Sequence, residues 1–144
     1  MISVQQLLAG KKNNRLIYIR PDQTVIEALE LMEEQNIGAV MVMQDHKLVG
    51  IFSERDYARK GIIKGRKAKS TPLTEVMIHD VITVTPEMTI DDCMQLFITR
   101  QIRHLPVMAD SVVLGMLSIG DIVNAIIQEQ EEHIKFLEQY IQGT

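Results

Sequence analysis

Cysteine and aromatic residues are scarce in this sequence. Of its 144 residues one is cysteine, none is tryptophan, and 4% are aromatic. The single cysteine, Cys93, excludes an intrachain disulfide and is typical of a protein from a reducing compartment. The lack of aromatic rings disfavours a base-stacking platform for single-stranded nucleic acid. The net charge of −4 likewise disfavours a general nucleic-acid binder.

Long apolar runs are also missing. The continuous apolar stretch at residues 38–43 is far shorter than the roughly 20 residues that a membrane-spanning helix needs. The first residues lack the basic-then-apolar pattern of a secretory signal. From these two absences and the single cysteine we expect a cytoplasmic protein that does not contact a membrane.

Motifs of catalysis and metal binding are absent as well. The sequence contains no paired catalytic carboxylates, no Ser-His-Asp arrangement, and no Walker-type or GxGxxG loop. His79 and Asp80 are adjacent, but no third metal ligand is near them in the sequence. We therefore expect neither an enzyme nor a metal site, and no catalytic cofactor.

The sequence does contain an internal repeat. Residues 21–56 align with residues 86–121 at a period of 65 without a gap, and ten of the 36 aligned positions are identical. Such a repeat fixes the architecture before any single residue is interpreted. Each copy alone is too small to bury a comfortable core, so we expect the two copies to share one. The expected organisation is a first repeat with its lead-in helix at residues 1–61, a linker at 62–72, a second repeat at 73–128 and a C-terminal helix extension at 129–144.

Each copy has the pattern strand, helix, strand, strand, helix, which predicts an α/β fold. In the first copy we expect strands at 16–19, 39–43 and 48–52 and helices at 24–36 and 53–61. In the second we expect strands at 81–84, 104–108 and 112–118 and helices at 89–99 and 121–142. Short lead-in helices at 3–9 and 73–77 precede the copies. Apolar residues at helical spacing and Ser/Thr-x-x-Asp/Glu capping boxes support these helices.

The ends of the two copies resemble those of a known family. The first copy ends GIFSERD at residues 50–56, the second ends GMLSIGD at 115–121, and the second also carries RHLPV at 103–107. Together these motifs resemble the CBS domain, named after cystathionine β-synthase, which occurs in tandem as a Bateman module. The resemblance covers nearly the whole chain. It implies two pseudo-twofold-related βαββα repeats packed through their sheets, in a stand-alone module of bacterial type.

The resemblance implies a regulatory protein that binds an adenosine-containing ligand, such as AMP, ADP, ATP or NAD, between its repeats. It implies that two copies associate into a disc-shaped homodimer, and that the ligand state is passed to a protein partner. By analogy Asp56 and Asp121 bind the ribose, because a carboxylate accepts hydrogen bonds from vicinal hydroxyls. The analogy further assigns Ser53 and Ser118 to the ribose; Ile37, Gly38, Ala39, Ile102 and Thr83 to the adenine; and Arg103, His104, Arg20 and Arg55 to the phosphates.

Several features also have purely structural interpretations. Ser-x-x-Asp is an ordinary capping box, and some CBS pairs serve as interaction scaffolds that bind no ligand. The basic stretch from Arg55 to Lys69 is either a solvated face or a surface for a phosphate or an acidic partner. Cys93 aligns with Ala28 on a buried helix face and therefore fits a core position. The last helix has surplus apolar residues, which suggests a subunit contact.

Overall fold

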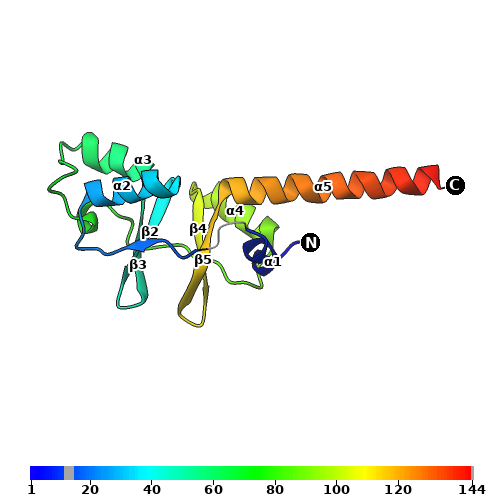
Figure 1. Ribbon diagram of the computed structural model, residues 1–144, viewed down its shortest axis with the longest axis horizontal. Helices are drawn as coiled ribbons and strands as arrows, with labels where there is room; N and C mark the ends of the chain where they lie inside the picture. Colours follow the sequence, from blue (N-terminus) through cyan, green and yellow to red (C-terminus); the bar gives the residue numbers. More distant parts are fainter. Residues whose placement is uncertain (12–14, 144) are drawn as a thin grey trace. The chain divides into compact units, whose positions relative to one another are not determined.

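The computed structural model describes residues 1–11 and 15–143. They form a mixed α/β fold (Figure 1). The first copy contains β1 (Tyr18–Ile19), α2 (Val25–Gln35), β2 (Ala39–Gln44), β3 (Lys47–Ser53), α3 (Glu54–Asp56) and the π-helix η1 (Tyr57–Ile62). The second contains α4 (Ile90–Arg100), β4 (His104–Ala109), β5 (Val112–Ser118) and α5 (Ile119–Gln142). The lead-in segments are α1 (Val4–Ala9) and the 3-10 turn η2 (Leu73–Glu75).

Three of the expected elements differ from the prediction. The strand expected at residues 81–84 is reduced to one isolated bridge between Val84 and Val107, although Val84 is buried. The lead-in helix expected at 73–77 is a single 3-10 turn. The helix expected at 53–61 is one turn of α-helix followed by a π-helix. In this π-helix the Tyr57 ring lies against Gly61, where an added Cβ would lie 2.9 Å from the ring.

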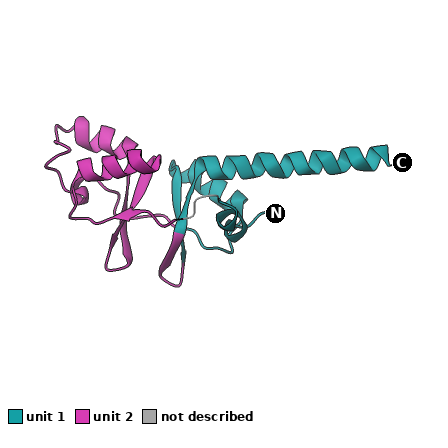
Figure 2. Ribbon diagram, viewed as in Figure 1, with its two compact units in different colours: residues 1–14, 84–108, 115–144 teal, residues 15–83, 109–114 magenta. Residues whose placement is uncertain are grey.

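The chain divides into two compact units that interleave along the sequence (Figure 2). Unit 1 comprises the described parts of residues 1–14, 84–108 and 115–144, and unit 2 comprises residues 15–83 and 109–114. These units differ from the sequence ranges expected for the repeats, because each lead-in segment belongs to the unit of the other copy. The lead-in α1 is in unit 1 with α4 and α5, whereas η2 is in unit 2 with α2 and the first sheet.

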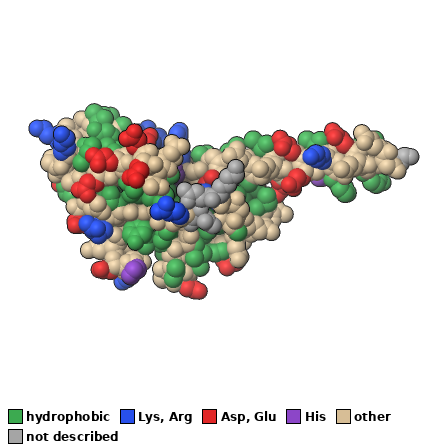
Figure 3. Space-filling model, in the orientation of Figure 1, with side chains coloured by type: hydrophobic (Ala, Val, Ile, Leu, Met, Phe, Trp, Pro, Cys, Tyr) green, Lys and Arg blue, Asp and Glu red, His purple; other side chains and the backbone are tan. Residues whose placement is uncertain are grey.

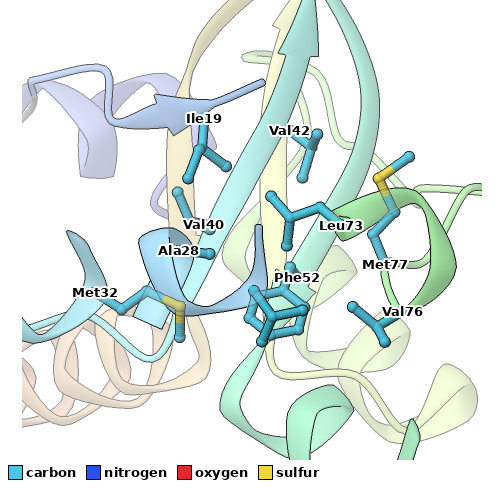
Figure 4. Packing of buried hydrophobic residues seen from close by; sticks show 10 residues of the cluster. Ile19, Ala28, Met32, Val40, Val42, Phe52, Leu73, Val76 and Met77 are labelled. Atoms are coloured by element: carbon cyan, nitrogen blue, oxygen red, sulfur yellow. The ribbon is translucent and has the colours of Figure 1, made fainter. Parts of the chain in front are cut away.

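In unit 2, a three-stranded sheet has the order β1-β2-β3, with β1 parallel and β3 antiparallel to β2. Its core contains Ile19, Ala28, Val40, Phe52 and the lead-in residues Leu73, Val76 and Met77 (Figure 4). The backbone N–H of Leu73 donates to the carbonyl of Gln23, and that of Val25 donates to the carbonyl of Thr71. Backbone hydrogen bonds and burial together therefore fix η2 on the first copy.

Strands β4 and β5 form a two-stranded sheet, and most of its residues belong to unit 1. The lead-in α1 is attached to the start of α4. The N–H of Val4 donates to the carbonyl of Met88 at 2.7 Å, and the N–H of Ile90 donates to the carbonyl of Ile2 at 3.1 Å. Among the buried residues of this unit are Val4, Ile90, Cys93, Phe97, Leu105, Val107, Leu117 and Ile122.

The glycines shared by the two copies explain how the lead-in segments pack. An added Cβ at Gly115 would lie 2.8 Å from Cδ1 of Leu8, and one at Gly50 would lie 2.6 Å from Sδ of Met77. Each glycine therefore makes room on the second strand of a hairpin for an apolar side chain of a lead-in segment. Real Cβ atoms do not approach so closely, so a larger residue at either position would displace the lead-in segment.

The repeat also appears in the backbone conformation. Within residues 1–11 and 15–143, the non-glycine residues with positive φ form three pairs at the period of 65: Asn36 and Gln101, Asp45 and Asp110, and His46 and Ser111. The first pair ends α2 and α4 in the left-handed conformation. The other two pairs are the two-residue turns between β2 and β3 and between β4 and β5, where positive φ at both positions matches the twist of the strands.

Candidate functional site

The first candidate site is the N-terminal cap of α3 in unit 2. The N–H and the hydroxyl of Ser53 each donate to Oδ2 of Asp56 at 3.0 Å, and the N–H of Asp56 donates to the Ser53 hydroxyl oxygen at 3.2 Å. Asp56 is buried. The capping box thus holds the carboxylate in one orientation. Among the described residues, the hydrogen bonds to this carboxylate both go to Oδ2, so the other oxygen, Oδ1, takes no part in the cap.

The residues predicted to contact adenine reach this cap from the first sheet. Ala39 pairs with Ser53 in the ladder of β2 and β3, and the N–H of Glu54 donates to the carbonyl of Gly38 at 3.2 Å. Ile37 and Gly38 are half-buried, and Ala39 is fully buried. The structure therefore brings the Gly38–Ala39 backbone to the Ser53–Asp56 cap.

The predicted phosphate contacts in unit 2 are less organised. Arg55 is exposed on the first turn of α3. Arg20 is exposed after β1, and its Nε donates to Oδ1 of Asp22 at 3.3 Å. Thr83, which was predicted to contact the adenine and not the phosphates, is exposed beside Val84. Among the described residues no hydrogen bond joins Thr83 to either cap.

The second candidate site is the N-terminal cap of α5 in unit 1. The N–H of Ser118 donates to Oδ2 of Asp121 at 2.8 Å, and the N–H of Asp121 donates to the Ser118 hydroxyl oxygen at 3.2 Å. The N–H of Ile119 donates to the carbonyl of Arg103 at 2.9 Å, the counterpart of the Glu54–Gly38 bond. Ile102 and His104 are half-buried, and Arg103 is exposed. The bond between Ile119 and Arg103 holds the backbone of Arg103 at the start of α5.

The second site contains a residue that the sequence did not reveal. Nζ of Lys11 lies 3.0 Å from Oδ2 of Asp121 and donates to the carbonyl of Met116 at 3.0 Å. Both charged side chains are about a quarter exposed, at 27% and 24%. No motif marks Lys11, and it lies outside the aligned copies. Asp121 is thus paired with a cation, whereas the described partner of the Asp56 carboxylate is the neutral Ser53.

The metal-binding and nucleophilic side chains of the described residues do not form a further site. No group of three metal-ligating side chains occurs in residues 1–11 and 15–143. Cys93 is buried, and this burial, with a contribution from the charge of Asp92, raises the pKa of its thiol to about 11. The thiol is therefore protonated near neutral pH, which makes it a poor nucleophile and suits a core position.

No helix in the described part of the chain is both long and apolar enough to cross a bilayer.

The visible face in Figure 3 shows basic side chains at one end of unit 2 and acidic side chains along α2. At both caps a capping box holds a carboxylate, which is a group that can accept hydrogen bonds from hydroxyl groups.

Comparison with known proteins gives a consistent match. The family model described as "CBS domain" matches twice, at residues 12–62 and 73–128. The mitochondrial CBS domain-containing protein CBSX3 of Arabidopsis thaliana is 42% identical over 132 residues, which are 88% of this chain and 64% of that protein. The CBS domain-containing protein YhcV of Bacillus subtilis is 35% identical over 112 residues, 77% of this chain and 79% of that protein.

Among solved structures, a putative signal-transduction protein with CBS domains from Burkholderia ambifaria superimposes with a TM-score of 0.86. It is 36% identical, and the match covers 89% of this chain and 96% of that one. The expected fold class, a mixed α/β structure with two CBS repeats, is confirmed.

Proposed function

The chain belongs to the CBS domain family, and from this premise we propose that it is a regulatory module that binds an adenine nucleotide or NAD. Tandem CBS domains are typically regulatory modules that bind adenosine-containing ligands. The observation that carries the proposal for this chain is the repeated cap, in which Asp56 and Asp121 are held in the same way by Ser53 and Ser118.

In this proposal, the two aspartates accept hydrogen bonds from the ribose hydroxyls. The cap uses one carboxylate oxygen of Asp56, so the other remains available to a ligand without loss of the helix start. Ser53 and Ser118 contact the sugar beside them. The adenine is assigned to Ile37, Gly38, Ala39, Ile102 and Thr83, and the phosphates to Arg103, His104, Arg20 and Arg55.

The two sites are proposed to differ in strength and specificity. Lys11 is already paired with Asp121. A ribose at that cap therefore competes with the Lys11 ammonium group for the carboxylate, unless the phosphate of the same ligand draws the ammonium group away. At the other cap the described hydrogen bonds to the Asp56 carboxylate come from Ser53 alone. We therefore assign the Asp56 site to ligands recognised through the nucleoside, and the Asp121 site to ligands with a phosphate near Lys11, Arg103 and His104.

The test is thermal unfolding of the purified chain with AMP, ADP, ATP, NAD and NADH, with GTP as the control. A ligand present at a hundred times its dissociation constant adds about 2.7 kcal/mol to the free energy of unfolding, which raises Tm by several degrees. We expect a rise that is selective for adenosine compounds. A flat panel for the folded protein would instead favour a scaffold that acts through protein contacts alone.

The residue assignment is tested with Asp56→Asn and Asp121→Asn. The amide oxygen of asparagine can still accept the capping hydrogen bonds, whereas the charge that favours the ribose hydroxyls is lost. We expect each variant to remove most binding at its own site, at least tenfold in dissociation constant measured by calorimetry. The matched control is Asp92→Asn, because Asp92 makes the same capping box with Thr89 at α4 and has no assigned ligand. Equal affinities in all three variants would refute the ribose assignment.

The remaining parts of the proposal concern the setting of the module. We place it in the cytoplasm because its one cysteine is buried and free, as expected in a reducing compartment. We propose no catalytic activity. We also propose that it works as a homodimer and passes its ligand state to a protein partner through a change in the population of two arrangements.

A further inference from the structure

The C-terminal half of α5 has an apolar stripe that its own unit does not cover. Every described residue from 127 to 143 is exposed. The exposed fractions are 48% for Ile127, 54% for Ile134 and 44% for Leu137. Figure 3 shows hydrophobic side chains on the visible face of this segment. An isolated helix of about 15 residues is marginally stable in water, so packing is needed to hold it.

The stripe is not a continuation of the face that packs on unit 1. That face contains the buried residues Ile122 and Ala125. At 100° per residue, its line continues through Glu129, Glu132, Phe136 and Tyr140, so beyond the unit it combines acidic and aromatic side chains. The apolar stripe lies roughly a third of a turn away from it. The stripe therefore faces something other than the unit from which the helix starts.

The spacing of the stripe is that of a coiled coil. Ile127, Ile134 and Ile141 are seven residues apart, and Gln130 and Leu137 follow the first two by three. Isoleucine at the first heptad position and leucine at the fourth favour a two-stranded parallel coil. If the two helices of such a coil are identical, the second one is the same segment of a second copy of this chain.

The side chains beside the stripe favour the same occupant in a parallel orientation. In a parallel pair, the imidazole of His133 lies beside the carboxylate of Glu138 of the second copy, because the seventh heptad position meets the fifth position of the next heptad. In an antiparallel pair, the line of Glu131 and Glu138 would meet its own copy, and like charges would repel. We propose that residues 127–141 of α5 form a parallel two-stranded coiled coil with the same segment of a second copy of this chain.

The decisive experiment is disulfide trapping in the full-length protein without nucleotide. Gln130→Cys and Leu137→Cys each place a thiol on the proposed seam, and Phe136→Cys is the control. Phe136 is 64% exposed on the same segment but faces away from the seam. The unsubstituted chain, with its buried Cys93, gives the background. With oxidised glutathione, we expect both seam variants to form covalent dimers at least tenfold faster than the control.

Several outcomes would overturn the proposal. Equal rates for the three variants would mean random collision, and trapping at only one seam position would indicate an antiparallel crossing. As a second measurement, Ile134→Asp should reduce helical circular dichroism and weaken association in sedimentation velocity, whereas Phe136→Asp should not. Identical behaviour of these two variants would also exclude the coil. Because no nucleotide is present, failure here leaves the ligand proposal untouched.

Discussion

At the scale of single residues, the two capping aspartates show what local sequence can and cannot reveal. Both capping boxes are predictable because the serine and the aspartate are three residues apart. The ion pair between Lys11 and Asp121 is not predictable, because its partners are separated by more than a hundred residues and no motif joins them. The sequence is therefore sufficient to predict that the two candidate sites are alike. The difference between them becomes visible only in the tertiary structure.

Cys93 gives a prediction about pH. Its pKa rises from an ordinary value of 9.0 to about 11 in the folded chain, so the unfolded state loses this proton at a lower pH. Stability from the protonated thiol is complete below pH 9 and is lost as the pH rises to 11. We expect the free energy of unfolding to fall across this range by about 2 kcal/mol more than in Cys93→Ala. Urea titrations at several pH values measure this difference, and parallel pH profiles would contradict it.

At the scale of elements, the paired glycines predict unequal effects of the same substitution. An added methyl group at Gly115 meets the flexible end of Leu8, whereas one at Gly50 also lies 3.0 Å from the backbone oxygen of Ile78. Overpacking costs typically about 1–3 kcal/mol. We expect Gly50→Ala to be near the upper end and Gly115→Ala near the lower end, as measured by chemical denaturation.

A double substitution at Leu8 and Gly115 tests the contact between these two residues. Leu8→Ala should partly restore the stability of Gly115→Ala, because it removes the side chain that the new methyl group meets. Simple addition of the two losses would show that Leu8 and position 115 do not interact.

The elements also show where sequence patterns mislead. The apolar stretch 81–84 has the composition of a strand, yet only Val84 makes a bridge, because hydrogen-bond partners along a sheet decide whether an extended segment is a strand. The helices α2 and α4 were predictable to within one or two residues, because their caps and apolar spacing agree. The lead-in segment at 73–77 also lacked such agreement: no side chain of the described residues caps it, and it forms a single 3-10 turn.

At the scale of the whole molecule, the interleaved units predict which fragments fold. The core of unit 2 includes Leu73, Val76 and Met77, which lie outside the sequence range of the first repeat. A fragment of residues 15–61 lacks these side chains and should remain unfolded. A fragment of residues 15–83 regains them and should show a cooperative thermal transition by circular dichroism. Equal behaviour of the two fragments would mean that η2 contributes little to this core.

The attachment of α1 to the second copy has a consequence for synthesis on the ribosome. Leu8 leaves the exit tunnel about a hundred residues before Gly115, against which it packs. Helix α1 must therefore wait, with its apolar face uncovered, until β5 has emerged. Unit 2 can form its sheet during this interval, whereas unit 1 can close only after β5 has left the tunnel. A nascent chain stalled before codon 115 would thus present an exposed helix that chaperones recognise.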